Sequence, residues 1–333
     1  MFRALRVRES AGGTFSRAVE NLNFDDLPQG EVTIRVLYSS LNYKDALSAS
    51  GNRGVTRLYP HTPGCDAAGI VAASEDPGWQ EGQKVIVTGY DLGMNTHGGF
   101  SEFIRVPSKW VVKLPDGLSL KQSMIIGTAG FTAGLGIRVI QRFSAISPGA
   151  EVLVTGASGG VGSFACAILA HLGFRVTACS SKASSHEFLE SLGVSRILSR
   201  SEFLGDHSRA LEKGIYSAMI DTVGGDSLCR GAAQCLPYSV AACCGMITSP
   251  VLKTSLIPFL LRGIRLVGLS AAQTPMEIRQ RIWEDLAGIW NFPALDPMGR
   301  EIPLDSLEKE IQRTLTGKQV GRVLIRVGEG MDG

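Results

Sequence analysis

The sequence predicts an α/β protein in which a doubly wound parallel sheet is inserted into a β-rich domain. From about residue 124, buried-type strands alternate with helical stretches, which is typical of a parallel sheet with helices on both faces. The end of the chain is mixed again, so we expect it to fold back onto the first part. That first part contains short strands separated by Gly, Pro, Asp and Asn, at 32–38, 64–73, 84–88 and 103–106.

The change in pattern predicts two domains. We expect a β-rich catalytic domain of residues 1–124 plus 266–333 and a nucleotide-binding domain of residues 125–265. In the second domain we expect strands at 151–155, 175–179, 197–198, 218–221, 239–243 and 264–268, with helices at 162–172 and 185–192. The tail is expected to add helices at 275–289 and 304–316 and a strand at 322–327.

The composition indicates a soluble, cytoplasmic protein. Its 333 residues exceed what one hydrophobic core usually organises, and 44% of them are hydrophobic. The formal net charge is +2 with no block of like charge, so we expect no nucleic-acid partner. The N-terminus lacks the apolar core of a signal peptide, and we expect no stretch able to span a bilayer and no membrane partner. Seven cysteines without a C-x-x-C pair predict neither a disulfide framework nor a zinc knuckle.

The clearest local motif is the glycine-rich turn TGASGGVGS at residues 155–163. It follows a buried strand, opens a helix and precedes a second strand, which is the context that a dinucleotide-binding turn requires. Glycines let a pyrophosphate approach the backbone, and the helix N-terminus offers it free N–H groups. The alternative is a tight strand-to-helix turn without a ligand.

The end of the second strand distinguishes NADH from NADPH. An NAD site usually carries Asp or Glu there to bind the ribose 2′-hydroxyl. Here the residues are Ser180, Ser181 and Lys182, and two hydroxyls with a cation suit a 2′-phosphate. The sequence therefore predicts NADPH as the cofactor; the alternative is that Lys182 is a solvated loop lysine.

The overall plan resembles the medium-chain dehydrogenase/reductase superfamily over essentially the whole chain. In its zinc alcohol dehydrogenases a cysteine, a histidine and a further cysteine bind the catalytic metal. Here Asn42 stands at the first position, Cys65 replaces the histidine, and residues 127–129 offer no ligand. Residues 89–100 also lack the cysteines of the structural zinc lobe. Because catalytic zinc needs three protein ligands, we expect no metal.

Five blocks are similar to the acrylyl-CoA reductase branch of the quinone-oxidoreductase-like enzymes, namely 39–47, 124–133, 155–163, 184–189 and 220–224. The resemblance implies a Rossmann sheet inserted into a GroES-like catalytic domain, in a cytosolic homodimer that reduces acryloyl-CoA to propanoyl-CoA with NADPH. It also implies that the cofactor is bound by Tyr43, Ser158, Gly159, Gly160, Val161, Ser180, Ser181, Lys182, Thr222, Leu266 and Arg322. The chain departs from the family pattern where Ser181 and Lys182 replace a glycine and an arginine, and where residues 269–273 lack an aspartate.

The expected reaction is hydride addition to the β-carbon of an α,β-unsaturated thioester, which places negative charge on the thioester oxygen. Asn42 and Tyr43 are the catalytic candidates for orienting that carbonyl and the nicotinamide. The alternative for both is a helix cap, because Asp45 follows three residues after Asn42. Arg53 and Arg57 are candidates for binding CoA phosphates, or are solvated loop residues.

Two other functions stay open at this point. A quinone or enone reductase would use the same zinc-free site and would need no CoA-binding surface. A non-catalytic NADPH-binding redox sensor would bind the cofactor without turnover.

Overall fold

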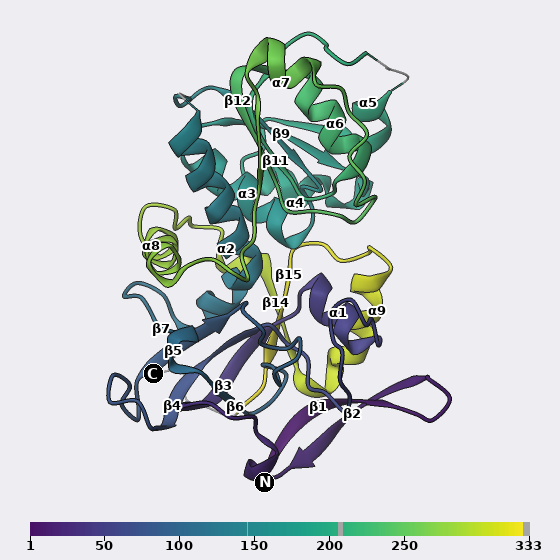
Figure 1. Ribbon diagram of the computed structural model, residues 1–333. Coiled ribbons are helices and arrows are strands. Elements are labelled where there is room, and N and C mark those ends of the chain that lie inside the picture. Colours follow the sequence, from purple (N-terminus) through teal and green to yellow (C-terminus); the bar gives the residue numbers. More distant parts are fainter. Residues whose placement is uncertain (145, 206–208, 329–333) are drawn as a thin grey trace. The chain divides into compact units, whose positions relative to one another are not determined.

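A computed structural model describes residues 1–144, 146–205 and 209–328 (Figure 1). The chain divides into two compact units. Unit 1 comprises Met1–Thr128, Ala272–Ala287 and Leu295–Gly333, and unit 2 comprises Ala129–Ala271 and Gly288–Ala294.

Unit 1 is built on a seven-stranded sheet and a two-stranded hairpin. The sheet order is β14-β15-β3-β4-β5-β7, with β6 also paired to β3, and the hairpin is β1-β2. The strands are β1 (Phe2–Glu9), β2 (Phe15–Leu22), β3 (Val32–Ser40), β4 (Asp66–Ser74), β5 (Lys84–Thr88), β6 (Phe103–Val106), β7 (Val111–Lys113), β14 (Gly299–Pro303) and β15 (Arg322–Arg326). The helices are α1 (Tyr43–Ala49), α8 (Met276–Ala287) and α9 (Leu307–Leu315).

The core of unit 1 follows from the alternation of its strands. Val32, Ile34 and Val36 of β3 are buried while the residues between them are partly exposed, as a sheet with one buried face requires. The last third of β3 is buried on both faces, so Ser39 and Ser40 are polar groups inside the protein. Buried polar groups of this kind need hydrogen-bond partners. Ser39 Oγ donates to the Asp66 carbonyl at 2.6 Å, and Ser40 Oγ donates to the Asp66 carboxylate at 2.7 Å.

Unit 2 is a six-stranded parallel sheet of order β10-β9-β8-β11-β12-β13. In chain order this is 3-2-1-4-5-6, the arrangement of a dinucleotide-binding fold. The strands are β8 (Glu151–Thr155), β9 (Arg175–Ser180), β10 (Arg196–Ser199), β11 (Tyr216–Asp221), β12 (Cys235–Cys243) and β13 (Arg265–Gly268). The helices are α3 (Gly160–His171), α4 (His186–Ser191), α5 (Arg200–Leu204), α6 (Gly225–Ala233) and α7 (Ile257–Arg262). The predicted fold class is confirmed.

Helix α2 (Leu120–Phe143) contains the point at which the chain passes from unit 1 to unit 2. It is interrupted at Gly127, whose φ of 49° and ψ of −160° are not helical. By length and composition α2 could cross a membrane, which corrects the expectation that no stretch could do so. Because 78% of its apolar window is buried inside the protein, we interpret α2 as a core helix.

The observed elements differ from the expected ones in several places. The elements that were not expected are β1, β2, β7, β14, α1, α2, α5, α6 and α7. Strand β12 begins four residues earlier than expected, and the expected helix at 304–316 starts with a 3₁₀ turn, Leu304–Ser306, before α9.

Candidate active site

The glycine-rich turn of unit 2 has the close backbone packing that its sequence indicates. Gly156 has a φ of 62°, in the left-handed region that favours glycine. A Cβ on Gly162 would lie 2.3 Å from the Gly156 carbonyl oxygen, so no side chain fits there. Gly159 is the N-cap of α3 and carries no side chain that could cap it. The first turn of a twelve-residue helix is therefore open to an anion such as a pyrophosphate.

Hydroxyl groups join this turn to the end of β9. The hydroxyl of Ser180 lies 2.9 Å from that of Ser158 and 3.1 Å from that of Ser185. The backbone N–H of Lys182 donates to Ser180 Oγ at 3.2 Å. Ser158 and Ser180 are both buried, whereas Ser181 is exposed, and burial lowers the pKa of Lys182. The structure thus brings together the predicted pyrophosphate and 2′-phosphate residues.

The carboxyl ends of β8 and β11 are held by the buried carboxylate of Asp221. It accepts hydrogen bonds from Thr155 Oγ1 at 2.6 Å and from the Gly224 N–H at 2.7 Å. Burial raises the pKa of Asp221, and these bonds oppose that rise. Thr222 follows directly and donates from Oγ1 to the Thr155 carbonyl at 2.9 Å. Thr222 therefore lies beside the glycine turn, at the edge of the sheet where ligands bind in this fold.

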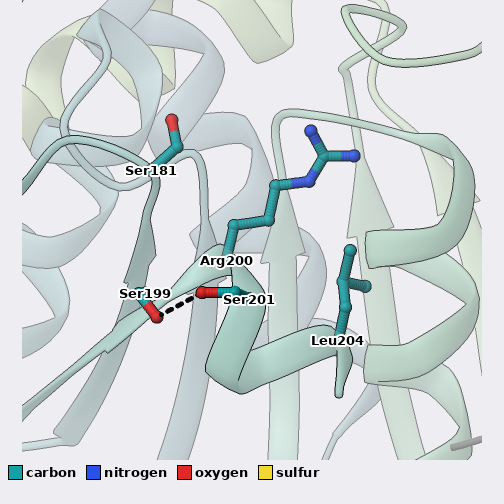
Figure 2. Close-up of a pocket in the computed structure, with 5 residues that line it drawn as sticks. All are labelled: Ser181, Ser199, Arg200, Ser201 and Leu204. Carbon is teal, nitrogen blue, oxygen red and sulfur yellow. Dashed lines mark hydrogen bonds between the residues drawn. The ribbon is translucent and has the colours of Figure 1, made fainter. Parts of the chain in front are cut away.

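A pocket of about 390 Å³ opens beside Ser181, one of the residues predicted to bind the 2′-phosphate (Figure 2). Its lining residues are Ser181, Ser199, Arg200, Ser201 and Leu204. Arg200 was missed in the sequence; the available signal was its place directly after β10, the strand that pairs with β9. Its Nε is buried and has no hydrogen-bond partner among the residues that the structure describes. An arginine in this setting suits a phosphate ligand.

In unit 1, the buried carboxylate of Asp66 is the centre of a hydrogen-bonded cluster. It accepts from Thr128 Oγ1 at 2.6 Å, from the Thr128 N–H at 2.9 and 3.0 Å and from Ser40 Oγ at 2.7 Å. Asn42 Nδ2 donates to it at 2.8 Å, and Arg322 Nη2 lies 3.8 Å away. Asp66 thus caps the helical segment that begins after the break at Gly127.

Arg322 is 3% exposed, and its guanidinium bonds to the protein on every nitrogen. Nε donates to the Ile125 carbonyl at 3.0 Å, Nη2 to Ser40 Oγ at 2.7 Å, and Nη1 to both the Leu41 carbonyl and Asn42 Oδ1. The structure places this predicted cofactor-binding residue inside unit 1, where it binds the start of α1. A direct contact with the cofactor stays a prediction.

Asn42 and Tyr43 begin helix α1, and their environments differ. The amide of Asn42 donates to Asp66 and, at 3.2 Å, to Asp45, while its oxygen accepts from Arg322. Its backbone N–H donates to Asp45 Oδ2 at 2.8 Å, which is cap geometry. Burial, together with the nearby charge of Asp66, raises the pKa of Asp45 to about 6. The Tyr43 side chain, in contrast, is 42% exposed. Of Asn42 and Tyr43, therefore, Tyr43 is the residue that can reach a ligand.

The three positions at which zinc relatives carry ligands are filled by this cluster. Asn42 Nδ2 lies 3.4 Å from Cys65 Sγ, which lies 3.9 Å from Thr128 Oγ1. A Cβ on Gly127 would lie 2.5 Å from Asp66 Oδ2, 2.6 Å from Ser40 Oγ and 2.8 Å from Arg322 Nη2. Burial holds the pKa of Cys65 far above its usual range, so its sulfur stays a thiol. Within the described residues no group of three acidic, His or Cys side chains could hold a metal ion.

Comparisons with known proteins agree with this geometry. The model of the alcohol dehydrogenase GroES-like domain matches residues 28–116, and that of the zinc-binding dehydrogenase domain matches 160–287. The chain is 41% identical to the probable acrylyl-CoA reductase AcuI of Escherichia coli, covering 97% of this chain and 99% of that protein. It is 40% identical to the acrylyl-CoA reductase AcuI of Ruegeria pomeroyi, covering 98% and 99%.

Among solved structures, the yhdH oxidoreductase of Salmonella enterica in complex with NADP has a TM-score of 0.94 at 42% identity, covering 98% of this chain and 100% of that one. The human protein named quinone oxidoreductase is 28% identical over 61% of this chain and 60% of its own length. This chain belongs to the medium-chain dehydrogenase/reductase superfamily and, within its quinone-oxidoreductase-like branch, to the acrylyl-CoA reductase family.

Proposed function

We propose that this chain is an NADPH-dependent oxidoreductase that reduces the activated carbon–carbon double bond of acryloyl-CoA, or of a related enoyl thioester, to the saturated acyl-CoA without a metal ion. One observation carries the proposal: identity of 40–41% over nearly the full length to two proteins named as acrylyl-CoA reductases. The glycine turn, with its open helix N-terminus, fits the pyrophosphate of such a cofactor.

We assign cofactor-binding roles to residues of unit 2. Ser158, Gly159, Gly160 and Val161 bind the pyrophosphate, and Thr222 and Leu266 contact the rest of the cofactor. Ser180, Ser181 and Lys182 bind the 2′-phosphate together with Arg200. The unpartnered Nε of Arg200 and the absence of an acid at the end of β9 support NADPH over NADH.

When bound, NADPH supplies the hydride for the β-carbon of the substrate. Charge then develops on the thioester oxygen, and a hydrogen-bond donor at this oxygen lowers the barrier. We assign this donor to the exposed phenol of Tyr43. Asn42 acts as a positioning residue, because its bonds to Asp66 and Arg322 fix the start of α1. Solvent supplies the proton for the α-carbon.

The test is NADPH consumption by the purified protein with acryloyl-CoA, crotonyl-CoA and a simple quinone offered separately, and with NADH as the control. Turnover of a thioester with NADPH is the expected result. Turnover of the quinone alone would move the function to a quinone or enone reductase, the candidate that the human relative favours. NADPH binding without any turnover would leave only a binding protein.

We further propose a soluble, cytoplasmic homodimer that forms through the edge of the unit 2 sheet. Strand β13 pairs only with β12 among the described residues, so its other edge is available for a second copy. Exposed apolar side chains lie on or just before it in the chain, namely Leu260, Leu261 and Leu266. Light scattering at micromolar concentration tests this, and a monomeric mass would contradict it.

A further inference from the structure

The loop after α1 carries a cation that the rest of unit 1 leaves exposed. Arg53, one of the two arginines expected to bind CoA phosphates, is already paired: its Nη2 lies 2.5 Å from both carboxylate oxygens of Glu9, and its guanidinium lies over the Tyr59 ring. Arg57 has an exposed side chain, and no carboxylate pairs with it anywhere in the described parts of the chain. The two arginines therefore have different tasks, and only Arg57 is available to an anion.

A second cation lies at the start of α1, next to the proposed catalytic tyrosine. Lys44 Nζ has the thioether sulfur of Met94 as its neighbour at 3.7 Å, and no acidic side chain of the described residues forms an ion pair with it. A thioether is a weak acceptor and leaves the ammonium charge uncompensated. Lys44 is thus a half-buried cation one residue from Tyr43.

One loop connects the two cations. Met94 contacts Lys44, and the next residue, Asn95, accepts a hydrogen bond from the Arg57 backbone N–H at 3.2 Å. The carboxylate of Asp91 lies in the same loop, but it is engaged by Asn95 Nδ2 at 3.0 Å and by Thr96 Oγ1 at 3.2 Å. Starting at Tyr43, the surface therefore presents Lys44, then the 94–95 turn, then Arg57, which we name the Lys44–Arg57 track.

The segment that carries Arg57 is anchored rather than free. Thr56 is buried, and its hydroxyl lies 2.7 Å from that of Ser48 on α1. Tyr59 Oη donates to the Ser48 carbonyl at 2.7 Å. Both neighbours of the Arg57–Leu58 pair are thus tied to α1, while Leu58 itself is 76% exposed. The backbone at Arg57 is therefore held in place, which lowers the entropy cost of bringing its guanidinium to a ligand.

We propose that the Lys44–Arg57 track binds the phosphate groups of the CoA moiety, with Leu58 as an apolar contact beside them. The inference rests on the proposed function, because an acyl group of three carbons offers little to recognise and the CoA phosphates carry most of the substrate's charge. A guanidinium matches phosphate through paired N–H donors, and an ammonium binds it as a point charge. The order of the track lets the thioester lie at Tyr43 while the charged end lies farther along unit 1.

The experiment compares acryloyl-CoA with acryloyl-N-acetylcysteamine, which has the same reacting atoms and no phosphates. Lys44→Gln and Arg57→Gln are each expected to raise KM for acryloyl-CoA about three- to tenfold, with kcat unchanged and with no effect on the short thioester. Lys109→Gln is the matched control, since Lys109 is an exposed lysine elsewhere in unit 1. Free CoA and pantetheine are titrated against the same proteins by calorimetry, and only CoA affinity should fall.

Equal increases in KM for both thioesters would overturn the proposal, because the substitutions would then act on α1 rather than on phosphates. Unchanged CoA affinity in the double variant would overturn it as well. A different result would contradict the proposed function: wild-type protein that reduces neither thioester. In that case the CoA titration still decides whether the Lys44–Arg57 track binds phosphate. Wild-type protein that reduces a thioester but binds no CoA would contradict the Lys44–Arg57 track alone.

Discussion

This chain contains two polar regions that differ in how their polar groups are used: one is open to a ligand, and in the other the groups bond to one another. The carboxyl edge of the unit 2 sheet carries backbone amides, small hydroxyls and an arginine Nε that has no partner among the described residues, so it is prepared to receive charge. The Asp66 cluster of unit 1 contains a carboxylate and a guanidinium whose bonding capacity is used within the protein. The first region stays open for a ligand, whereas the second stabilises a helix start and leaves only Tyr43 exposed. A polar cluster is therefore a candidate binding site only where some of its hydrogen-bonding groups are not already bonded to the protein.

Asp66→Asn tests the closed region and should have the largest effect. It keeps the shape but removes the negative charge that acts most strongly on buried Arg322, which should destabilise unit 1 by about 3–5 kcal/mol. Denaturant unfolding measures this. Asp305→Asn is the control, because its pair with Arg3 is exposed and should matter little. Equal stability of the two variants would contradict the difference between buried and open charge.

Acid should also act on unit 1, through His61. Burial lowers the pKa of His61 to about 4, from the usual 6.5. Between these two pKa values the unfolded chain binds a proton that the folded protein does not. The His61 contribution to the free energy of unfolding is therefore fully present above about pH 6.5 and is lost as the pH falls toward 4. For His61 alone the loss is about 3 kcal/mol across this window.

The difference between wild type and His61→Gln in stability against pH measures this contribution together with the effect of His61 on His97, whose pKa burial also lowers to about 4. Asp45 has the opposite sign, because its raised pKa of about 6 makes the folded state take up a proton first. This opposite contribution is present in both proteins and cancels. Parallel curves for the two proteins between pH 4.5 and 7 would show that His61 is not the group responsible.

Arg200→Gln tests the open region. Loss of its guanidinium should weaken NADPH binding about 10- to 100-fold while NADH binding changes little, since only NADPH has the 2′-phosphate. Fluorescence titration of both cofactors measures the ratio. Arg196→Gln should leave the ratio unchanged, because Arg196 is an exposed arginine at the start of β10, the strand that precedes Arg200. A similar fall for both cofactors would assign Arg200 to the structure of the pocket instead.

Tyr43→Phe should give the smallest change and separates the two neighbours at the start of α1. Removing the phenol oxygen should lower kcat about tenfold with melting temperature unchanged. Asn42→Ala should lower the melting temperature as well, because it removes a partner of Asp66, Asp45 and Arg322. Steady-state kinetics and thermal unfolding of both variants are the measurement. A Tyr43→Phe enzyme with full kcat would remove the tyrosine from the mechanism.

What could be predicted from the sequence depends on how far apart the interacting residues are. The glycine turn is contiguous, and its residues, Ser158 among them, lie where the pattern indicates. Arg200 was missed because it reaches Ser181 only through the pairing of β10 with β9, where Ser199 is opposite Ser180. The Asp66 cluster joins residues up to 282 positions apart, which no local pattern reports.

The same reasoning explains the two arginines of the loop after α1. Arg53 and Arg57 look alike in the sequence, yet Glu9, 44 residues earlier, pairs with the first of them. The hairpin β1-β2 that carries Glu9 was not expected as an element, so this difference could not be anticipated. The long apolar helix α2 was not predicted; its break at Gly127 lies against Asp66, Ser40 and Arg322, which come from three other strands.

The bare backbone at Gly127 has an evolutionary consequence. The space that a side chain would need there is taken by Asp66, Ser40 and Arg322, within 2.8 Å of where a Cβ would stand. A side chain at this position would have to displace Asp66, Ser40 or Arg322, which hold the start of α1 and the helical segment after Gly127. One substitution could therefore not introduce a metal ligand at residue 127 without disturbing that cluster.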